Sequence, residues 1–327
     1  MSLPRRIALA LTLTLAASLG LASAARAQAW PNKPVTVVVP LSAGSAIDVI
    51  ARHVGSELGK RLGQSVIIDN RVGASGNIGA AFVAKAPADG YTLLITTSSF
   101  AMAPAVTANL PWDPRKSFAP IAQMWTAALV WGVNPSLPVK SMAELIDYAA
   151  KHPGELNYGT PGTGSLHHFA TELVVQQTGM KVVHVPYKGL AQVVVDLIGG
   201  RVQIGYMSTG NLLEPHRAGK VRILATSSEQ RLPQLPEVPT LRELGLKDAE
   251  VNGWVAMFAP AGTPNDVLAR LRREVPEIMK LPATQTVLAN NGSLPLLPGT
   301  AEQLARDYGN ELDLWPRVAA RAGIKAE

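Results

Sequence analysis

The 327-residue sequence contains no cysteine, only 17% charged residues and only 5% aromatic residues. The absence of cysteine excludes a disulfide framework, a thiolate nucleophile and any zinc or iron–sulfur centre bound through cysteine. It also excludes a lipid attached to an N-terminal cysteine. The 47% share of hydrophobic residues is too high, and the charge too sparse, for an intrinsically disordered chain. The length favours two folded units.

A long uncharged segment occurs only at the N-terminus. Arg5 and Arg6 precede an uncharged run that extends to Ala25, and Ala25-Arg26-Ala27 has the small-x-small pattern of a cleavage site. A transmembrane anchor is the alternative, but the run is rich in Ala, Ser, Thr and Gly and is followed at once by the cleavage pattern. We therefore expect a signal peptide at residues 1–27, cleaved after Ala27, and a mature protein in the periplasm.

The positive charge of the chain lies largely in this leader. The formal net charge of +6 falls to +3 without residues 1–27, which contain three arginines and no acidic residue. No later run of Lys and Arg is longer than Arg272-Arg273, and no later segment approaches 18 apolar residues. These features argue against a nucleic-acid partner and against membrane embedding.

After the leader, short apolar strands alternate with helical patterns. Val35 to Val39 has the continuous β-branched composition of a strand buried on both faces, and a helix is predicted from about Asp48. Thr263 is expected to cap a helix whose first position is Pro264, and Thr300 is expected to cap the last helix. This alternation predicts an α/β fold with mainly parallel sheets flanked by helices.

The domain organisation is predicted from two proline-rich segments. Residues 134–138 and 259–264 each follow a predicted strand, and we interpret them as two crossings between lobes. The first lobe is then discontinuous, with residues 28–130 plus 254–327, and residues 131–253 form a second lobe inserted into it.

Two junctions between a strand and a helix stand out, one in each predicted lobe: Ser42-Ala43-Gly44-Ser45-Ala46-Ile47-Asp48 and Gly159-Thr160-Pro161-Gly162-Thr163-Gly164-Ser165. Such places offer unpaired backbone N–H groups and the positive end of a helix dipole to an anion. The alternative is two ordinary tight turns with hydroxyl caps. The occurrence of one junction per lobe favours a ligand held between them.

A third glycine-rich segment, residues 73–79, has the spacing G-x-x-G-x-x-G. This is not the dinucleotide-binding pattern, and no Walker lysine follows it. We interpret it as a plain loop between a strand and a helix.

Candidate catalytic groups are weak. Ser45 and Ser165 both lack the G-x-S-x-G pattern of a nucleophile elbow. His168 and Glu172 are four residues apart and could bind a metal, but a hydrogen-bonded histidine at a helix start is favoured. Asp48 could act as a general base or could only stabilise its loop. We expect no catalytic residue, no metal and no cofactor, and retain an exported serine hydrolase as an alternative.

Several short motifs occur in a specific order: Trp30-Pro31-x-Lys33-Pro34, Asn70-Arg71 through Gly79, Ala88-Asp89-Gly90-Tyr91-Thr92, Val133 through Pro138, Asn157-Tyr158 with the following Gly-rich loop and His168, Val185-Pro186-Tyr187-Lys188-Gly189, and Phe258 through Pro264. Through them the chain resembles the Bug-type extracytoplasmic solute receptors of tripartite tricarboxylate transporters. The resemblance implies a monomeric, two-lobed periplasmic-binding-protein fold that closes on a small carboxylate and delivers it to a membrane permease. A ligand sensor for a two-component histidine kinase is the alternative.

The resemblance also implies ligand contacts from the loop after the first strand, the end of the third strand, and the Gly-rich loop and strand ends of the second lobe. The residues at these positions are Leu41, Ser42, Ala43, Gly44, Ser45, Ala46, Ile47, Asp48, Thr97, Ser98, Ser99, Thr160, Gly162, Thr163, Gly164, Ser165, His168, Tyr187, Met207 and Ser208.

The chain departs from the family pattern at several of these positions. Leu41 replaces an aromatic residue, Ser45 and Ala46 occupy glycine or serine positions, and Ile47 replaces a threonine. Met207 stands where an acidic residue is common. Ile47 and Met207 would make the cleft more apolar, and the missing acid removes an acceptor for an amine. We therefore predict a carboxylate with an apolar body, aromatic or aliphatic, in preference to an amino acid.

Overall fold

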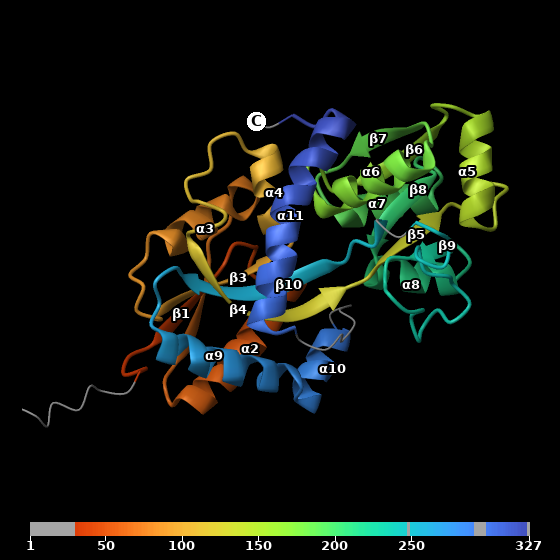
Figure 1. Ribbon diagram of the computed structural model, residues 1–327. Coiled ribbons are helices and arrows are strands. Elements are labelled where there is room, and N and C mark those ends of the chain that lie inside the picture. The colour runs from red at the N-terminus through yellow and green to blue at the C-terminus, as the bar shows by residue number, and fades with distance from the viewer. Residues whose placement is uncertain (1–29, 247–248, 291–298, 326–327) are drawn as a thin grey trace, which may run out of the picture.

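The computed structural model describes residues 30–246, 249–290 and 299–325, so the predicted signal peptide lies outside the described residues (Figure 1). Two five-stranded sheets form the framework. The first has the order β2-β1-β3-β10-β4, with β1 (Val35–Val39), β2 (Val66–Asn70), β3 (Thr92–Thr97), β4 (Phe118–Ala127) and β10 (Gly253–Pro260). The second has the order β7-β6-β8-β5-β9, with β5 (Leu129–Val133), β6 (Leu156–Thr160), β7 (Val182–Pro186), β8 (Ile204–Ser208) and β9 (Arg222–Thr226).

The two sheets have the same arrangement of strand directions. In the first sheet β10 is antiparallel to both of its neighbours, and the other four strands run one way. In the second sheet β5 holds the corresponding reversed position. By position, β1 therefore corresponds to β6 and β3 to β8. The predicted α/β fold with two mainly parallel sheets is confirmed.

The passage from the first sheet to the second contains no proline. Strand β4 ends at Ala127 in the first sheet, and β5 begins at Leu129 in the second, with only Ala128 between them. The interpretation of residues 134–138 and 259–264 as crossings is wrong, because each segment follows a strand whose lobe it stays in. An extended chain crosses directly and needs no turn. The division at residues 131–253 remains a prediction.

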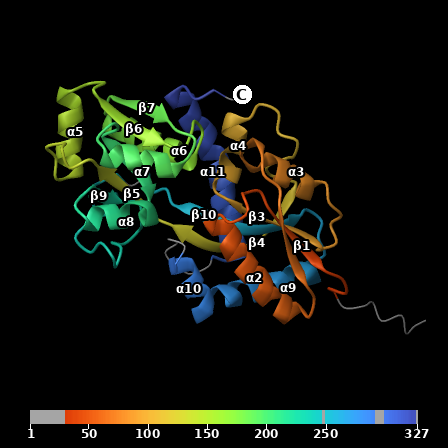
Figure 2. The same ribbon diagram turned by 180° about the vertical axis from the view of Figure 1, so that it is seen from behind.

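Helices cover both faces of the first sheet (Figure 1, Figure 2). Val37 and Val39 face a core shared with α2 (Ala46–Leu62), α9 (Asn265–Met279) and α10 (Pro282–Asn290). Val38, which points the opposite way, packs in a core shared with α3 (Asn77–Ala84), α4 (Ser99–Val106) and α11 (Ala301–Ala322). This alternation of fully buried residues explains the continuous apolar run in β1.

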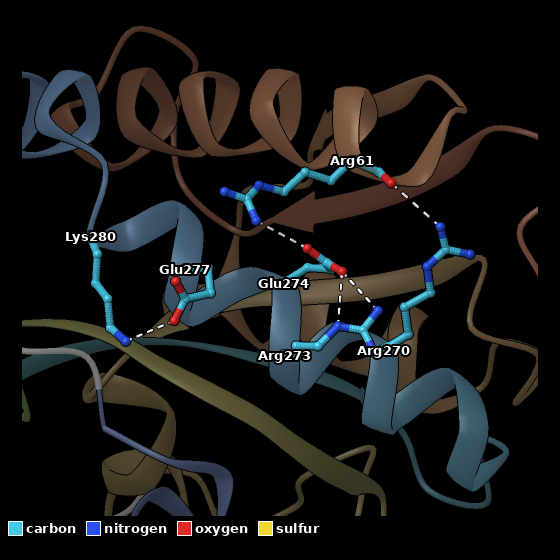
Figure 3. A network of polar contacts seen from close by, with 6 residues as sticks. All are labelled: Arg61, Arg270, Arg273, Glu274, Glu277 and Lys280. Atoms are coloured by element: carbon cyan, nitrogen blue, oxygen red, sulfur yellow. Dashed lines mark hydrogen bonds and ion pairs between the residues drawn. The ribbon is translucent and has the colours of Figure 1, made fainter.

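Polar contacts join α2 to α9 on the outer surface (Figure 3). Glu274 accepts hydrogen bonds from Arg273 at 2.8 Å and from Arg61 at 3.1 Å, and these contacts lower its pKa. Arg270 donates to the backbone carbonyl of Arg61. Lys280 pairs with Glu277 one turn further along α9. Such exposed pairs each contribute little to stability, and only the contacts of Arg61 with Glu274 and Arg270 join the two helices.

The last helix packs against both lobes. Tyr308 stacks on Phe100 of α4 with ring centroids 5.4 Å apart, and Trp315 lies 5.4 Å from Phe169 of α6 (Leu166–Thr178). Figure 1 shows α11 running along both lobes. The second lobe is completed by α5 (Met142–Lys151), α7 (Leu190–Ile198) and α8 (Thr209–Arg217). Although residues 254–327 are predicted to belong to the first lobe, α11 therefore links the two. No helix among the described residues is long and apolar enough to cross a membrane.

Two predicted helix starts have different outcomes. Thr300 caps α11 as predicted, and its hydroxyl accepts from the Gln303 N–H at 3.2 Å. Thr263 does not cap α9. The capping residue is Pro264, whose ψ of 142° is not helical, and the Thr263 hydroxyl donates instead to the carbonyl of Pro260 at 2.8 Å.

Candidate functional site

Four helices begin where parallel strands end, and each has serine at its N-cap position, although only the hydroxyls of Ser45 and Ser165 accept a capping hydrogen bond. Ser45 begins α2 after β1, and Ser98 begins α4 after β3. In the second lobe Ser165 begins α6 after β6, and Ser208 begins α8 after β8. The carboxyl ends of neighbouring parallel strands lie at one edge of a sheet, where α/β proteins bind ligands. Each lobe thus brings two positive helix ends to this edge.

The junction of the first lobe is built around Asp48. The Ser45 hydroxyl accepts from the Asp48 N–H at 3.3 Å, and the carboxylate accepts from Gly44 N (2.8 Å), Arg52 Nε (3.0 Å) and Asn70 Nδ2 (2.9 Å). Burial alone would raise the pKa of Asp48, but the hydrogen bonds from these groups hold it below its usual value. Asp48 is 2% exposed. Its contacts within its own lobe support the loop-stabilising alternative over a general base.

The junction of the second lobe has a histidine in the place of this aspartate. The Ser165 hydroxyl accepts from the His168 N–H at 3.3 Å, and the Gly164 N–H donates to Nδ1 of His168 at 3.1 Å. The ring of His168 stacks on His184, with centroids 3.8 Å apart, and Nε2 of His184 lies 2.7 Å from the Thr160 hydroxyl. Burial lowers the pKa of both histidines to about 4, so both are neutral at neutral pH.

His168 and Glu172, the candidate metal ligands, are each hydrogen-bonded to another residue. The carboxylate of Glu172 accepts a hydrogen bond from the hydroxyl of Tyr158, and burial together with this contact raises the pKa of that phenol. Nδ1 of His168 is used by Gly164. In the part of the chain that the structure describes, no three His, Asp or Glu side chains gather as a metal site would require.

The larger of two cavities at the junctions has a volume of about 580 Å³. Seven predicted site residues line it: Ala46, Ile47, Thr97, Ser98, Ser99, Ser165 and Ser208. The remaining lining residues are Trp125, Ala127, Pro161, Leu166, His167, Leu190, Gly210, Asn211, Gly253, Trp254 and Val255. Both lobes therefore contribute to its wall.

A smaller cavity of about 370 Å³ adjoins it. Predicted residues in its lining are Leu41, Ser42, Thr97, Ser99, Gly162, Thr163, Gly164 and Ser165. The two cavities share Thr97, Ser99, Pro161 and Ser165, so they are neighbouring compartments of one cleft. Among the described residues, neither lining includes Asp, Glu, Lys or Arg. An anion here would be bound by backbone amides and hydroxyls.

The glycine-rich segment at 73–79 is more than a connecting loop. Gly73, Gly76 and Asn77 line the smaller cavity. Gly73 and Gly76 have φ values of 125° and 96°, which favour glycine. Gly79 lies so close to β1 that a Cβ there would be 2.9 Å from Pro40 Cβ. The spacing thus serves close packing of α3 beneath the cleft.

Eight predicted site residues do not line either cavity: Ala43, Gly44, Ser45, Asp48, Thr160, His168, Tyr187 and Met207. The Tyr187 hydroxyl donates to Asp196 at 2.9 Å. Met207 is fully buried in a core with Val193 and Leu197, whereas Ile47 lines the larger cavity. Of the two substitutions expected to make the cleft apolar, only Ile47 is placed to do so.

Sequence reasoning missed the two tryptophans of the cleft. Trp125 and Trp254 lie on β4 and β10, which pair antiparallel, and no local motif marks them. The Trp254 indole donates to Glu311 of α11 at 2.9 Å, and burial raises the pKa of Glu311 to about 7. By contrast, Gly210 and Asn211 follow the Ser208 cap, so the correspondence of β8 with β3 would have suggested them.

The two lobes touch at the second junction. Gly164, with φ of 75°, lies against Val106 of α4, and a Cβ on Gly164 would be 2.6 Å from Val106 Cγ1. A different hollow of about 800 Å³ lies beside α2 and β2 and includes Arg52, Gln64 and Ile67. Only one lobe forms that hollow, and no helix begins there. The cleft between the lobes is therefore the candidate site.

Comparisons with known proteins agree with this geometry. The family model described as "Tripartite tricarboxylate transporter family receptor" matches residues 50–323. Protein BugT of Bordetella pertussis is 34% identical over 91% of this chain and 92% of its own length. An R. palustris protein solved with adipate is 36% identical, with a TM-score of 0.76 over 91% of this chain and all of that one. MatC of Rhodopseudomonas palustris, solved with bound malate, is 31% identical, with a TM-score of 0.72 over 88% and 99%.

These matches confirm the two-lobed binding-protein fold and the expected family. The relatives are solute-binding receptors rather than enzymes, so the serine hydrolase alternative is not supported. Ser45 and Ser165 act as helix caps in this chain. The chain belongs to the receptor family of the tripartite tricarboxylate transporters.

Proposed function

We propose that the protein captures a small carboxylate-bearing solute between its lobes in the periplasm and delivers it to the permease subunits of a tripartite tricarboxylate-type transporter. The observation that carries the proposal is a cleft at which four helices begin, each with serine at its N-cap position. No acidic side chain among the described residues lines this cleft. Adipate and malate in two structural neighbours support a carboxylate ligand.

The smaller compartment suits the carboxylate. Gly162, Thr163, Gly164 and Ser165 bring the start of α6 to its wall, and Ser42 approaches from the first lobe. Backbone N–H groups at a helix start donate to anions, and the helix dipole adds to the attraction. A site without Lys or Arg binds the anion with neutral donors only, so release to a permease does not require breaking a buried ion pair.

The larger compartment suits the body of the ligand. Ile47, Trp125 and Val255 present apolar surface from the first lobe. An amino acid would bring an ammonium group, and the described lining offers no carboxylate to pair with it. Desolvating an unpaired charge is costly, so a carboxylate with an apolar body is favoured over an amino acid.

Closure of the lobes would convert binding into a signal for the permease. A ligand that contacts both junctions gains its full set of contacts only when they face each other, so it shifts the population toward the closed form. The contact of Gly164 with Val106 supports a closed arrangement of this kind.

The test is a thermal-shift screen of the mature chain, residues 28–327, against carboxylic acids, their matched amines and the corresponding amino acids. A ligand with micromolar affinity at millimolar concentration stabilises by about 4 kcal/mol, which is readily measured. We expect acids to raise the melting temperature and amines to leave it unchanged. Stabilisation by amino acids above their matched acids would contradict the proposed ligand class, and no response to any acid would overturn the carboxylate assignment.

A further inference from the structure

A buried histidine, His167, lies at the cleft and takes no part in binding the carboxylate as proposed above. His167 is the second residue of α6, lines the larger cavity and is 9% exposed. Its Nε2 is one of seven buried side-chain atoms without a hydrogen-bond partner among the described residues, and it is the only one of the seven whose residue lines this cavity. A buried polar atom without a partner costs free energy, so a protein retains one only where something compensates.

The other five histidines of the chain all have a partner. His53 and His184 lie within hydrogen-bond distance of threonine hydroxyls, at 2.9 and 2.7 Å. His152 contacts Glu155, His168 accepts from Gly164, and His216 contacts the carbonyl of Val221. The lack of a partner for Nε2 is therefore specific to His167, the one histidine that lines the cavity.

The surroundings of His167 combine polar and apolar groups. Ser208 and Asn211 line the same cavity from the second lobe, together with the apolar side chains of Leu166 and Leu190. The first lobe contributes both apolar side chains, such as Ile47 and Trp125, and the hydroxyl residues 97–99. His167 is therefore one of several polar groups of the wall that a ligand could meet. Burial lowers the pKa of His167 to about 4, so at neutral pH the ring is an uncharged donor and acceptor.

We propose that His167 determines ligand specificity, by forming a hydrogen bond with a second polar group that the ligand carries away from its bound carboxylate. This inference rests on the proposed function, since it assumes that a carboxylate occupies the smaller compartment. Because Nε2 is enclosed in the ligand-free structure, the ring has to turn for this nitrogen to meet the ligand, and a ligand with such a group then satisfies the buried imidazole. One with only a hydrocarbon tail leaves it unpaired, and the site discriminates against that ligand about 10-fold or more.

The probes are three acids with the same six-carbon chain: hexanoate, 6-hydroxyhexanoate and adipate. An aromatic pair, benzoate and 4-hydroxybenzoate, extends the set. Affinities are measured by calorimetry, with thermal shifts for weak binders, for the wild type, His167→Leu and His167→Gln. His152→Leu is the control, since that histidine is exposed and lines neither cavity.

We expect the wild type to bind the acids with a second polar group at least tenfold more tightly than their apolar partners. His167→Leu should lose this preference without weaker binding of hexanoate or benzoate, His167→Gln should keep part of it, and His152→Leu should match the wild type. Because leucine removes a buried unpaired polar atom, the ligand-free His167→Leu protein should melt at the same or a higher temperature than the wild type.

The outcomes separate the two proposals. If both proteins bind acids and the ranking of the acids is the same in each, the specificity role is wrong while the receptor function stands. A markedly lower melting temperature of ligand-free His167→Leu would also overturn it, because the imidazole would then have a structural partner. If no acid binds the wild type, the carboxylate receptor proposal fails, and the inference built on it fails as well.

Discussion

In the first lobe Gly44 donates its N–H to Asp48, and in the second lobe Gly164 donates its N–H to His168, four residues further on in each case. Both loops are capped by serine and follow corresponding strands. The acceptor is a carboxylate paired with Arg52 in one loop and a neutral, stacked imidazole in the other. The two loops therefore make the same backbone hydrogen bond, but the acceptor is charged in the first lobe and neutral in the second.

The difference predicts where an anion is held more strongly. The Asp48 carboxylate already lies at the positive end of α2 and partly neutralises it, so this helix attracts a bound anion less strongly. His168 brings no charge to the start of α6. We expect the carboxylate of the ligand to lie closer to α6 than to α2.

The largest expected effect follows from giving the second junction the charge of the first. In His168→Asp the new carboxylate can accept from Gly164, but the residue four positions on is Glu172 rather than an arginine. An uncompensated negative charge should weaken acid binding about 100-fold, or about 3 kcal/mol. Calorimetry with the best acid of the screen measures it. His168→Asn is the control, because its amide oxygen replaces Nδ1 without charge, and equal losses in both variants would contradict the electrostatic reading.

How far the sequence predicts the site depends on whether the signal is local. Serine caps and small residues mark the two junctions in the sequence itself, and the β-branched run Val35–Val39 predicts the strand before the first of them. The crossing at Ala128 and the placement of Trp125 and Trp254 depend on antiparallel pairing between distant segments, so no local pattern reveals them. Met207 is predicted to line the site but lies in the core of the second lobe. Its place at a strand end is visible in the sequence, but the face of the sheet on which its side chain lies depends on the strand register.

A second effect concerns glycines at corresponding positions. Gly44 and Gly164 have φ values of 79° and 75°, but a Cβ on Gly44 meets nothing within 4 Å, whereas one on Gly164 meets Val106 of the other lobe. Alanine should cost each protein a similar 1–2 kcal/mol of stability from backbone strain. Only Gly164→Ala should also weaken ligand binding, by about tenfold, because it opposes closure.

Thermal unfolding and calorimetry test this pair together. The double variant Gly164→Ala with Val106→Ala should recover much of the affinity, since the smaller side chain makes room for the new methyl group. Equal affinities of Gly44→Ala and Gly164→Ala would show that the contact with Val106 is not needed for binding.

The third comparison is the response of the junctions to acid. The pKa values of His168 and His184 fall from 6.5 to about 4 on folding, so between these values the unfolded chain binds more protons and stability decreases as the pH falls. The pKa of Asp48 is lowered from 3.8, so its contribution is kept until the pH falls below that value. The second junction should therefore weaken first.

Thermal unfolding of the wild type and His168→Asn between pH 7 and 4.5 measures this difference. Each buried histidine contributes a slope of about 1.4 kcal/mol per pH unit, so the variant should lose less stability on acidification. Glu311 acts in the opposite direction, because its raised pKa favours the folded state below about pH 7, but it is common to both proteins. Parallel curves for the two proteins would mean that His168 does not stay neutral in the folded state.

The smallest effect separates the two apolar substitutions predicted to shape the cleft. Ile47 lines the larger cavity, whereas Met207 is fully buried in the core of the second lobe. Ile47→Thr should weaken binding of 4-methylpentanoate about fivefold, or about 1 kcal/mol, through lost apolar contact, and should narrow its advantage over leucine, the matched amino acid.

Met207→Leu should leave both affinities unchanged, because a core substitution of similar volume alters stability rather than the wall of the cavity. The pair therefore tests whether selectivity for an apolar body comes from one side of the cleft. Ile47 lines the cavity at the first junction, and His167 occupies the corresponding position in the second lobe. If Met207→Leu changed the ranking of the ligands, or if Ile47→Thr left it unchanged, the selectivity would come from the second lobe instead of the first junction.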